Sequence, residues 1–436
     1  MQQRCMKLTL NLNLNPIAAL LCSIPLAVVG FYAIAVVYYP GIYVISTYED
    51  LYGEWAQTYG FLTTFVFSTL ISLNKSHPQR WFFVLLAAAS FYVFMEEISW
   101  GQRIIGFDTP NFFHDNSYQD EANLHNLLTG PVDSWSKTIL TYFVATGLVA
   151  YGVLFPIGLQ IKFKPALWLS RMRIAAAPPL PLMPAFAAAA VLEIELFSFN
   201  EAEVAELLVA WALAFTALDS WLQSRNAPNK SVTPYVTVFL GIVGAAWGTT
   251  TLLLNSPEQR KEIDSRLANG YERFAERYEG YDYTYGVAEV LQRYDELEPN
   301  NTVILRKIAD NLEVLGEAEK ARFFMQKAVD EGLRRVKEDA NNIQANVSLA
   351  KSYRKLGDYG AMAVYAEKAY QLAQAKQQTE PDNAYWAYWL AKACEQTNRR
   401  EEAFKYYRKA HQLEPNSSRY DEAYQQMKKI MIDYEN

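Results

Sequence analysis

Two adjacent glutamates, Glu96 and Glu97, are the residues of this sequence that most need a chemical explanation. They end an apolar run that begins at Trp81, and Arg103 follows them closely. Carboxylates beside lipid-facing residues are costly, so they are kept where they have a function or a fixed partner. An adjacent pair of carboxyl groups can separate its pKa values and supply one acid and one base. We therefore predict Glu96, Glu97 and Arg103 as candidate catalytic residues.

A second stretch downstream supplies another carboxylate and an imidazole. Glu121 and His125 are spaced so that, on a helix, their side chains share one face. Together with Glu97 they form a predicted metal-ligand set, and such a set suits Zn²⁺, Mn²⁺ or Fe²⁺. A divalent metal held there would acidify a bound water beside a substrate at the membrane surface. The spacing matches neither the His-Glu-x-x-His zinc motif nor the Glu-x-x-His motif of di-iron bundles.

The same residues also fit a purely structural role. Glu96, Trp100 and Arg103 recur at helical spacing, so a helix that continued through them would place all three on one face. Trp100 and Arg103 would then donate hydrogen bonds to the glutamates and lock the helices together. The sequence leaves the catalytic, metal-binding and structural interpretations open.

Apolar segments dominate the first half of the 436-residue chain. A spanning helix requires about 20 mostly apolar residues. Seven segments meet this requirement, at residues 17–39, 56–73, 81–99, 138–158, 180–198, 204–222 and 234–254. The first run is longer than the apolar region of a signal peptide and lacks a clean cleavage site, so we expect it to be retained.

The short loops between these segments differ sharply in charge. Basic residues gather in one set of loops, at Arg4, Lys7, Lys75, Arg80, Lys162, Lys164, Arg171, Arg173, Arg225 and Lys230. The alternate loops hold only two basic residues, Arg103 and Lys137, beside the acidic residues Glu49, Asp50, Glu54, Asp108, Asp115, Asp120, Glu121, Asp133, Glu201 and Glu203. Because basic loops stay in the cytoplasm, the N-terminus is predicted to be cytoplasmic and everything after Leu254 extracytoplasmic. The glutamate pair then faces the extracytoplasmic side.

Composition excludes some classes of protein. The formal net charge of −7 is shared by both halves of the chain and provides no basic surface for nucleic acid. Three cysteines, Cys5, Cys22 and Cys394, fit neither a disulfide framework nor a clustered metal site. The expected partners are membrane lipid and another protein.

The second half of the chain repeats itself. Three copies with a period of 41 residues start near Thr302, Ile343 and Ala384, and small residues recur at matching positions such as Ala328, Ala369 and Ala410. Here the chain resembles the tetratricopeptide repeat family, whose period is 34 residues. The extra residues of the first two copies correspond to about two more turns on the second helix or its exit.

This resemblance implies a solenoid of helix pairs with a concave surface that binds a protein segment. Tyr385, Trp386, Tyr388 and Trp389 could line that surface, although aromatic residues also serve as helix packing. The predicted fold is therefore all-α: a polytopic membrane domain at 1–255, linker and capping helices at 256–301, and a TPR-like solenoid with a C-terminal capping helix at 302–436.

The membrane half also resembles a group of bacterial integral membrane proteins that carry E-E-I-S-W-G-Q-R followed by N-L-H-N, here at residues 96–103 and 123–126. The resemblance implies a shared site and a bacterial inner-membrane setting, but no activity.

Two functions compete on these grounds. The first is an inner-membrane protein that presents an extracytoplasmic interaction domain for envelope assembly. The second is a membrane-embedded, metal-dependent hydrolase or transferase acting on a lipid or a lipid-linked glycan. A transporter would need a polar path to the cytoplasmic side, and the inner helix halves offer little besides Asp219.

Overall fold

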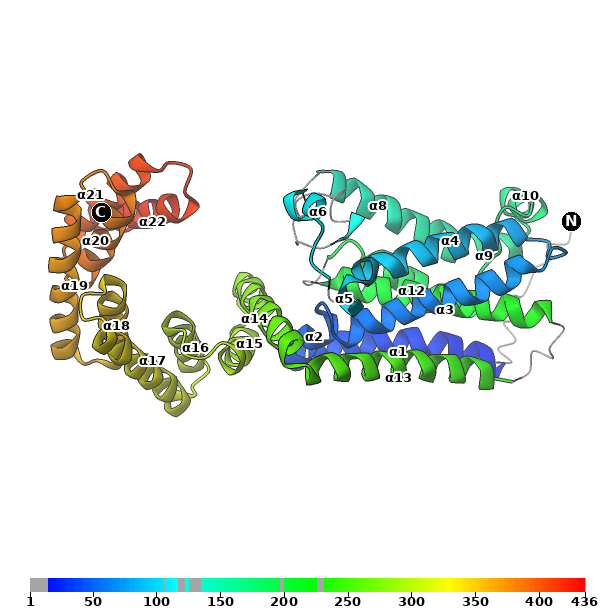
Figure 1. Cartoon of the computed structure of the whole chain (residues 1–436), viewed down its shortest axis with the longest axis horizontal. Helices are drawn as coiled ribbons and strands as arrows, with labels where there is room; N and C mark the ends of the chain where they lie inside the picture. Colours follow the sequence, from blue (N-terminus) through cyan, green and yellow to red (C-terminus); the bar gives the residue numbers. More distant parts are fainter. Residues whose placement is uncertain are drawn as a thin grey trace, which may run out of the picture. The chain divides into compact units, whose positions relative to one another are not determined.

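The computed structural model describes residues 15–105, 107–116, 122–124, 135–196, 200–225 and 231–435. Throughout these residues the regular structure is helical, which confirms the all-α prediction. The chain divides into two compact units, Met1–Gly270 and Tyr271–Asn436. Helix α14 (Pro257–Gly280) passes from the first unit into the second (Figure 1).

Unit 1 is built from long helices that run alongside one another (Figure 1). Its first elements are α1 (Pro16–Tyr38), α2 (Pro40–Thr47), α3 (Tyr52–Leu73), α4 (Arg80–Glu97), η1 (Ser99–Gly101), α5 (Gln102–Ile105) and α6 (Asn111–Asn116). They are followed by α8 (Trp135–Val149), η2 (Ala150–Leu154), α9 (Phe155–Gln160), α10 (Lys164–Arg171), η3 (Leu180–Leu182), α11 (Met183–Leu192), α12 (Glu201–Ser224) and α13 (Thr233–Asn255).

Helix α3 is the central element of unit 1, since it packs against α2, α4, α12 and α13. Gly60 allows α12 to approach closely, because a Cβ atom there would lie only 2.9 Å from the Cβ atom of Ala210. One residue further along α12, the indole N–H of Trp211 donates to the carbonyl oxygen of Ala56 at 3.2 Å. These contacts set the register of α12 against α3.

Three helical segments among the described residues are long and apolar enough to cross a membrane: Pro16–Tyr38, Lys137–Gln160 and Thr233–Asn255. They correspond to the first, fourth and seventh predicted spans. The fifth predicted span, 180–198, is shorter in the structure than predicted, because the apolar helix ends at Leu192. The chain leaves the helix through two acidic residues, Glu193 and Glu195, and Glu195 adopts a left-handed φ of 46°.

Unit 2 continues from the end of α14 and consists of paired helices. They are α15 (Thr284–Leu297), α16 (Thr302–Val314), α17 (Ala318–Glu338), α18 (Ile343–Leu356), α19 (Tyr359–Thr379), α20 (Ala384–Gln396), α21 (Arg400–Leu413) and α22 (Ser418–Glu435). The first helix of each predicted repeat begins at the residue expected from the period. Asn301, Asn342 and Asn383 cap these helices by accepting hydrogen bonds from backbone N–H groups of the first turn.

The additional residues of the repeats lie on the second helices, as predicted. Helices α17 and α19 each have 21 residues, whereas α21 of the third repeat has 14. The difference of seven residues is about two helical turns. Ala328, Ala369 and Ala410 are fully buried at equivalent points of the three helices, so small side chains let each pair of helices pack closely.

Candidate functional site

The glutamate pair lies where α4 ends. The sequence predicted a helix continuing toward Arg103, and this was wrong, because α4 stops at Glu97. Ser99, Trp100 and Gly101 have positive φ values of 47°, 53° and 94°, which no α-helix contains. Serine and glycine are weak helix formers, so this segment leaves the helix at a small cost in free energy.

Glu96 is held in place despite this break. Its side chain is 5% exposed, and the indole N–H of Trp100 donates to its Oε1 atom at 2.6 Å. The side-chain amide of Asn123 donates to the Glu96 backbone carbonyl at 3.4 Å. The contact between Trp100 and Glu96 expected from the structural interpretation is therefore present, although a turn rather than a continuous helix produces it.

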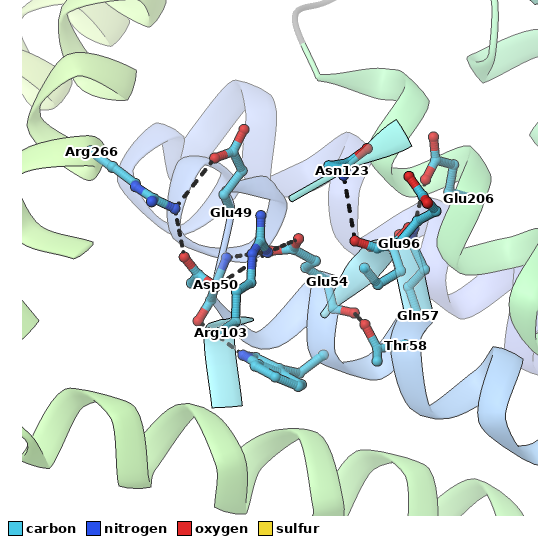
Figure 2. A network of polar contacts seen from close by, with 12 residues as sticks. Glu49, Asp50, Glu54, Gln57, Thr58, Glu96, Arg103, Asn123, Glu206 and Arg266 are labelled. Atoms are coloured by element: carbon cyan, nitrogen blue, oxygen red, sulfur yellow. Dashed lines mark hydrogen bonds and ion pairs between the residues drawn. The ribbon is translucent and has the colours of Figure 1, made fainter. Parts of the chain in front are cut away.

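Glu97 takes part in a different contact, which joins three helices. The side-chain amide of Gln57 on α3 donates to Oε1 of Glu97 at 3.1 Å and to Oε2 of Glu206 on α12 at 2.6 Å. Gln57 itself is 1% exposed. One buried amide thus bridges two carboxylates from different helices, and Figure 2 labels Gln57 and Glu206 of this bridge.

The contacts that Figure 2 draws from Arg103 lead to Asp50 and Glu54. The Nη1 atom of Arg103 contacts Oδ1 of Asp50 at 3.2 Å and also bonds to Glu54, and all three side chains are largely buried. On the other side of Asp50, Nη1 of Arg266 contacts Oδ2 at 2.8 Å. Asp50 therefore accepts from two arginines that are far apart in the sequence.

Glu96, Glu97 and Arg103 thus lie close together at the end of α4 but divide among separate partners. The predicted metal ligands Glu121 and His125 lie outside the described residues. Among the residues that the structure does describe, no group of three or more His, Cys, Asp or Glu side chains could hold a metal ion. The catalytic roles of Glu96, Glu97 and Arg103 and the metal set containing Glu97 stay predictions.

Sequence reasoning missed Gln57 and Arg266. Gln57 carries a recognisable signal, because it is an amide in a helix whose other buried residues are mostly apolar or small. Arg266 carries none, since arginines are common in the charged second half of the chain. Asp50 and Glu54 were noted only as acidic loop residues.

The arrangement is chemically suited to holding positive charge at one end of the bundle. Carboxylates close to one another repel, and an arginine, an amide or a bound cation lowers that repulsion. Arg103 and Arg266 provide such neutralisation for Asp50 and Glu54, whereas Glu97 and Glu206 share the neutral amide of Gln57. The Oε1 atom of Gln57 is buried and has no hydrogen-bond partner in the described structure.

The aromatic residues of the third repeat are half-buried and contribute to packing. Tyr388 contacts the rings of Tyr407 and Tyr420, with centroids 5.8 and 5.3 Å apart. Trp386 packs against the hydrophobic core of the repeats. Helix packing therefore accounts for much of this aromatic cluster, as the sequence allowed.

Comparisons with known proteins bear on unit 2. Two profiles, both described as tetratricopeptide repeat, match residues 343–376 and 384–417, which are the second and third predicted copies. No curated protein sequence matches the chain. Both profile matches lie outside 1–255, so the resemblance of the membrane half to bacterial integral membrane proteins stays a prediction.

Solved structures add little to this assignment. MamA from Desulfovibrio magneticus RS-1 aligns with 38% of this chain and 87% of its own, at 19% identity and a TM-score of 0.19. The TPR domain of P58(IPK) aligns with 80% of this chain and 94% of its own, at 12% identity and a TM-score of 0.17. Similarities this weak show nothing further about this chain. The profile matches and the helix register together show that residues 343–417 carry tetratricopeptide repeats.

Proposed function

We propose that this chain is an integral protein of a bacterial inner membrane that presents its repeats to a protein partner on the extracytoplasmic side, in assembly of the cell envelope. The observation that carries the proposal is the pair of tetratricopeptide repeats at 343–417. Such repeats stack into extended surfaces that bind protein segments. The partner on the repeats is therefore a protein, and the partner of unit 1 is membrane lipid.

The surface of unit 1 supports membrane embedding. Large apolar side chains project from several of its helices, including Leu70 on α3, Leu85 on α4, Phe143 on α8 and Leu252 on α13, which are 41, 69, 74 and 73% exposed. Extended apolar surface of this kind marks a membrane or protein contact. Helices α3 and α12 have 22 and 24 residues. At 1.5 Å per residue their lengths are about 33 and 36 Å, which is enough to cross a hydrocarbon core about 30 Å thick.

The ends of unit 1 support the proposed orientation with seven crossings. Figure 1 places α10 and the turn between α3 and α4 at one end, and α2, α5 and α6 at the other. The first end carries Lys75, Arg80 and Lys164, whereas the second carries Asp50 and Glu54. A basic end is retained in the cytoplasm. An arrangement with three crossings would also place the repeats outside the cytoplasm. The three-crossing and seven-crossing arrangements therefore differ only in the side on which some of the loops before the last crossing lie.

Cysteine labelling in cells tests this topology. In a chain with Cys5, Cys22 and Cys394 replaced by serine, we would introduce Lys75→Cys, Asp108→Cys or Asn416→Cys, all at exposed positions. With seven crossings, a membrane-impermeant maleimide added to the periplasmic side labels positions 108 and 416 but reaches position 75 only after the inner membrane is permeabilised. Labelling of position 75 in intact membranes would reduce the proposal to three crossings. Protection of position 416 would overturn it.

A truncation tests the interaction function. Chemical crosslinking in cells would compare the intact chain with a chain ending at Asn301, before the first repeat. We expect the crosslinked partner to disappear with the repeats while the truncated chain stays in the membrane. A partner retained by the truncated chain would show that the repeats are not the binding region.

Nothing in the described residues favours the hydrolase or transferase alternative. The polar groups around the glutamate pair have partners within the protein. Trp100 and Asn123 donate hydrogen bonds to Glu96, Gln57 donates to Glu97, and Arg103 donates to the nearby Glu54. These are the contacts that a structural role requires. We therefore propose that these carboxylates and their partners hold together the helices at the end of the bundle where α14 begins.

A further inference from the structure

The first helices of the three repeats, α16, α18 and α20, form a continuous face of unit 2. A hydrogen bond of 2.7 Å between the hydroxyl groups of Thr302 and Ser348 joins the first two of these helices. Asp310, Lys351 and Lys392 lie at equivalent positions of the three helices, 41 residues apart. The same position therefore changes from acidic to basic along the face.

Lys351 is the unusual member of this set. It is half-buried and makes no ion pair or hydrogen bond with a described residue. Three of the charged groups that face it are cations, Arg306, Arg354 and Lys392, and one is an anion, Glu395. Burial, followed by the charge of Lys392, lowers the pKa of Lys351 to about 8.

Carboxylates neutralise the neighbouring cations only in part, since Asp310 acts on Arg306 and Glu395 lies beside Lys392. Arg306 is 9% exposed, and its Nη1 atom donates to the hydroxyl groups of Ser348 and Ser352 at 2.8 and 3.3 Å. Among the described residues, the Lys392 ammonium pairs with the carboxylate of Glu395 at 3.9 Å, the outer limit of an ion pair. This face thus holds excess positive charge within a chain whose net charge is −7.

A cleft of about 970 Å³ adjoins these cations. Met362, Met427 and Ile430 provide apolar wall, and Arg354 and Glu395 belong both to the cleft and to the charged groups around Lys351. A cleft of this size accepts several side chains of a bound segment. Apolar contacts and cations that outnumber the nearby carboxylates are therefore available to one ligand.

We propose that this face binds an acidic protein segment, with a carboxylate of the segment between Lys351 and Lys392 and a neighbouring apolar side chain in the cleft lined by Met362, Met427 and Ile430. The inference rests on the proposed function and specifies the chemistry of its partner. Charge complementarity carries it, because a carboxylate replaces repulsion between cations with attraction.

Proton uptake follows from the same geometry. A bound carboxylate stabilises the ammonium form of Lys351 and raises its pKa above the value of about 8 in the free protein. Binding therefore takes up a proton near pH 8. If only the ammonium form binds, affinity falls by up to about tenfold between pH 7 and pH 9.

Fluorescence anisotropy with the full-length protein in detergent tests the proposal. The probe is a fluorescein-labelled decapeptide of alternating aspartate and leucine, and the matched control replaces every aspartate by asparagine. We expect the aspartate peptide to bind at least tenfold more tightly. Lys351→Met and Lys392→Met each weaken it at least fivefold, whereas Lys320→Met, on the exposed part of α17, changes it less than twofold. Lys351→Arg keeps binding and loses most of the pH dependence.

The outcomes separate this inference from the proposed function. Equal affinity for the two peptides, or unchanged affinity in both methionine variants, overturns the acidic-segment inference. A cooperative melt confirms that each variant is folded. If the aspartate peptide fails to bind while the intact chain still crosslinks a partner that the truncated chain does not, this inference falls and the proposed function stands.

Discussion

Arg266 of α14 donates to the carboxylate of Asp50 at a distance of 2.8 Å, across 216 positions of the sequence. The other oxygen of the same carboxylate contacts Arg103 at 3.2 Å. Next to this pair, Gly270 of α14 lies against the ring of Tyr48 so closely that an added Cβ atom would be 2.4 Å from it. Asp50 therefore ties α14 and the segment after α4 to the turn that precedes α3.

Asp50→Asn tests this tie. The substitution keeps the side-chain shape and tolerates the left-handed φ of 62°, but it removes the charge shared by Arg103 and Arg266. We expect the free energy of unfolding in detergent to fall by about 2 kcal/mol, the size typical of hydrogen bonds to charged groups. The control is Glu262→Gln, which removes a carboxylate that also pairs with Arg266 but is 64% exposed. Equal effects of the two variants would contradict the special role of Asp50.

Trp100→Phe tests the contact that holds Glu96. The variant leaves a carboxylate that is 5% exposed without its indole donor, so we expect a loss of about 1–2 kcal/mol in unfolding free energy. Trp81→Phe is the matched control, since Trp81 is 70% exposed. Thermal unfolding followed by circular dichroism measures both. A Trp100 variant as stable as the control would show that the hydrogen bond contributes nothing to stability.

Gly60→Ala tests the close approach of α3 and α12. The new methyl group would lie 2.9 Å from the Cβ atom of Ala210, so the helices must separate, at a cost of about 1–3 kcal/mol. Gly241→Ala on α13 is the control, because no atom lies within 4 Å of its added Cβ. There the better helix propensity of alanine predicts a gain of up to about 1 kcal/mol. Opposite signs of the two melting-temperature shifts are the expected result, and a stabilised Gly60 variant would contradict the packing.

The lowered pKa of Lys351 predicts that the stability of the folded protein depends on pH. Its pKa is about 8 in the folded chain and 10.5 when unperturbed, so the unfolded state binds more protons between these values. Stability contributed by this group therefore rises as pH increases from about 8 to 10.5. Chemical denaturation of wild type and Lys351→Met at pH 7.5 and pH 10 measures the difference, in which other titrating groups cancel. We expect wild type to gain stability relative to the variant at pH 10, and a constant difference would contradict the lowered pKa.

Local periodicity explains what could be predicted in unit 2. A repeat with a period of 41 residues specifies the same helix pair each time, so the starts at Thr302, Ile343 and Ala384 followed from the sequence. The longer second helices followed for the same reason. Each of these features depends on residues close together in the chain, and neighbouring repeats bury their faces only against one another.

The polar contacts around Glu96, Glu97 and Arg103 in unit 1 could not be predicted without the tertiary structure. The sequence determined that Glu96, Glu97 and Arg103 gather near one end of an apolar bundle, because loop charge and helix length are local properties. It did not determine that Arg103 turns to Asp50 and Glu54, or that Gln57 bridges Glu97 and Glu206. Those partners come from separate helices, and the left-handed turn after Glu97 re-aims Arg103. Pairing between distant segments is decided by how helices pack, which no local spacing encodes.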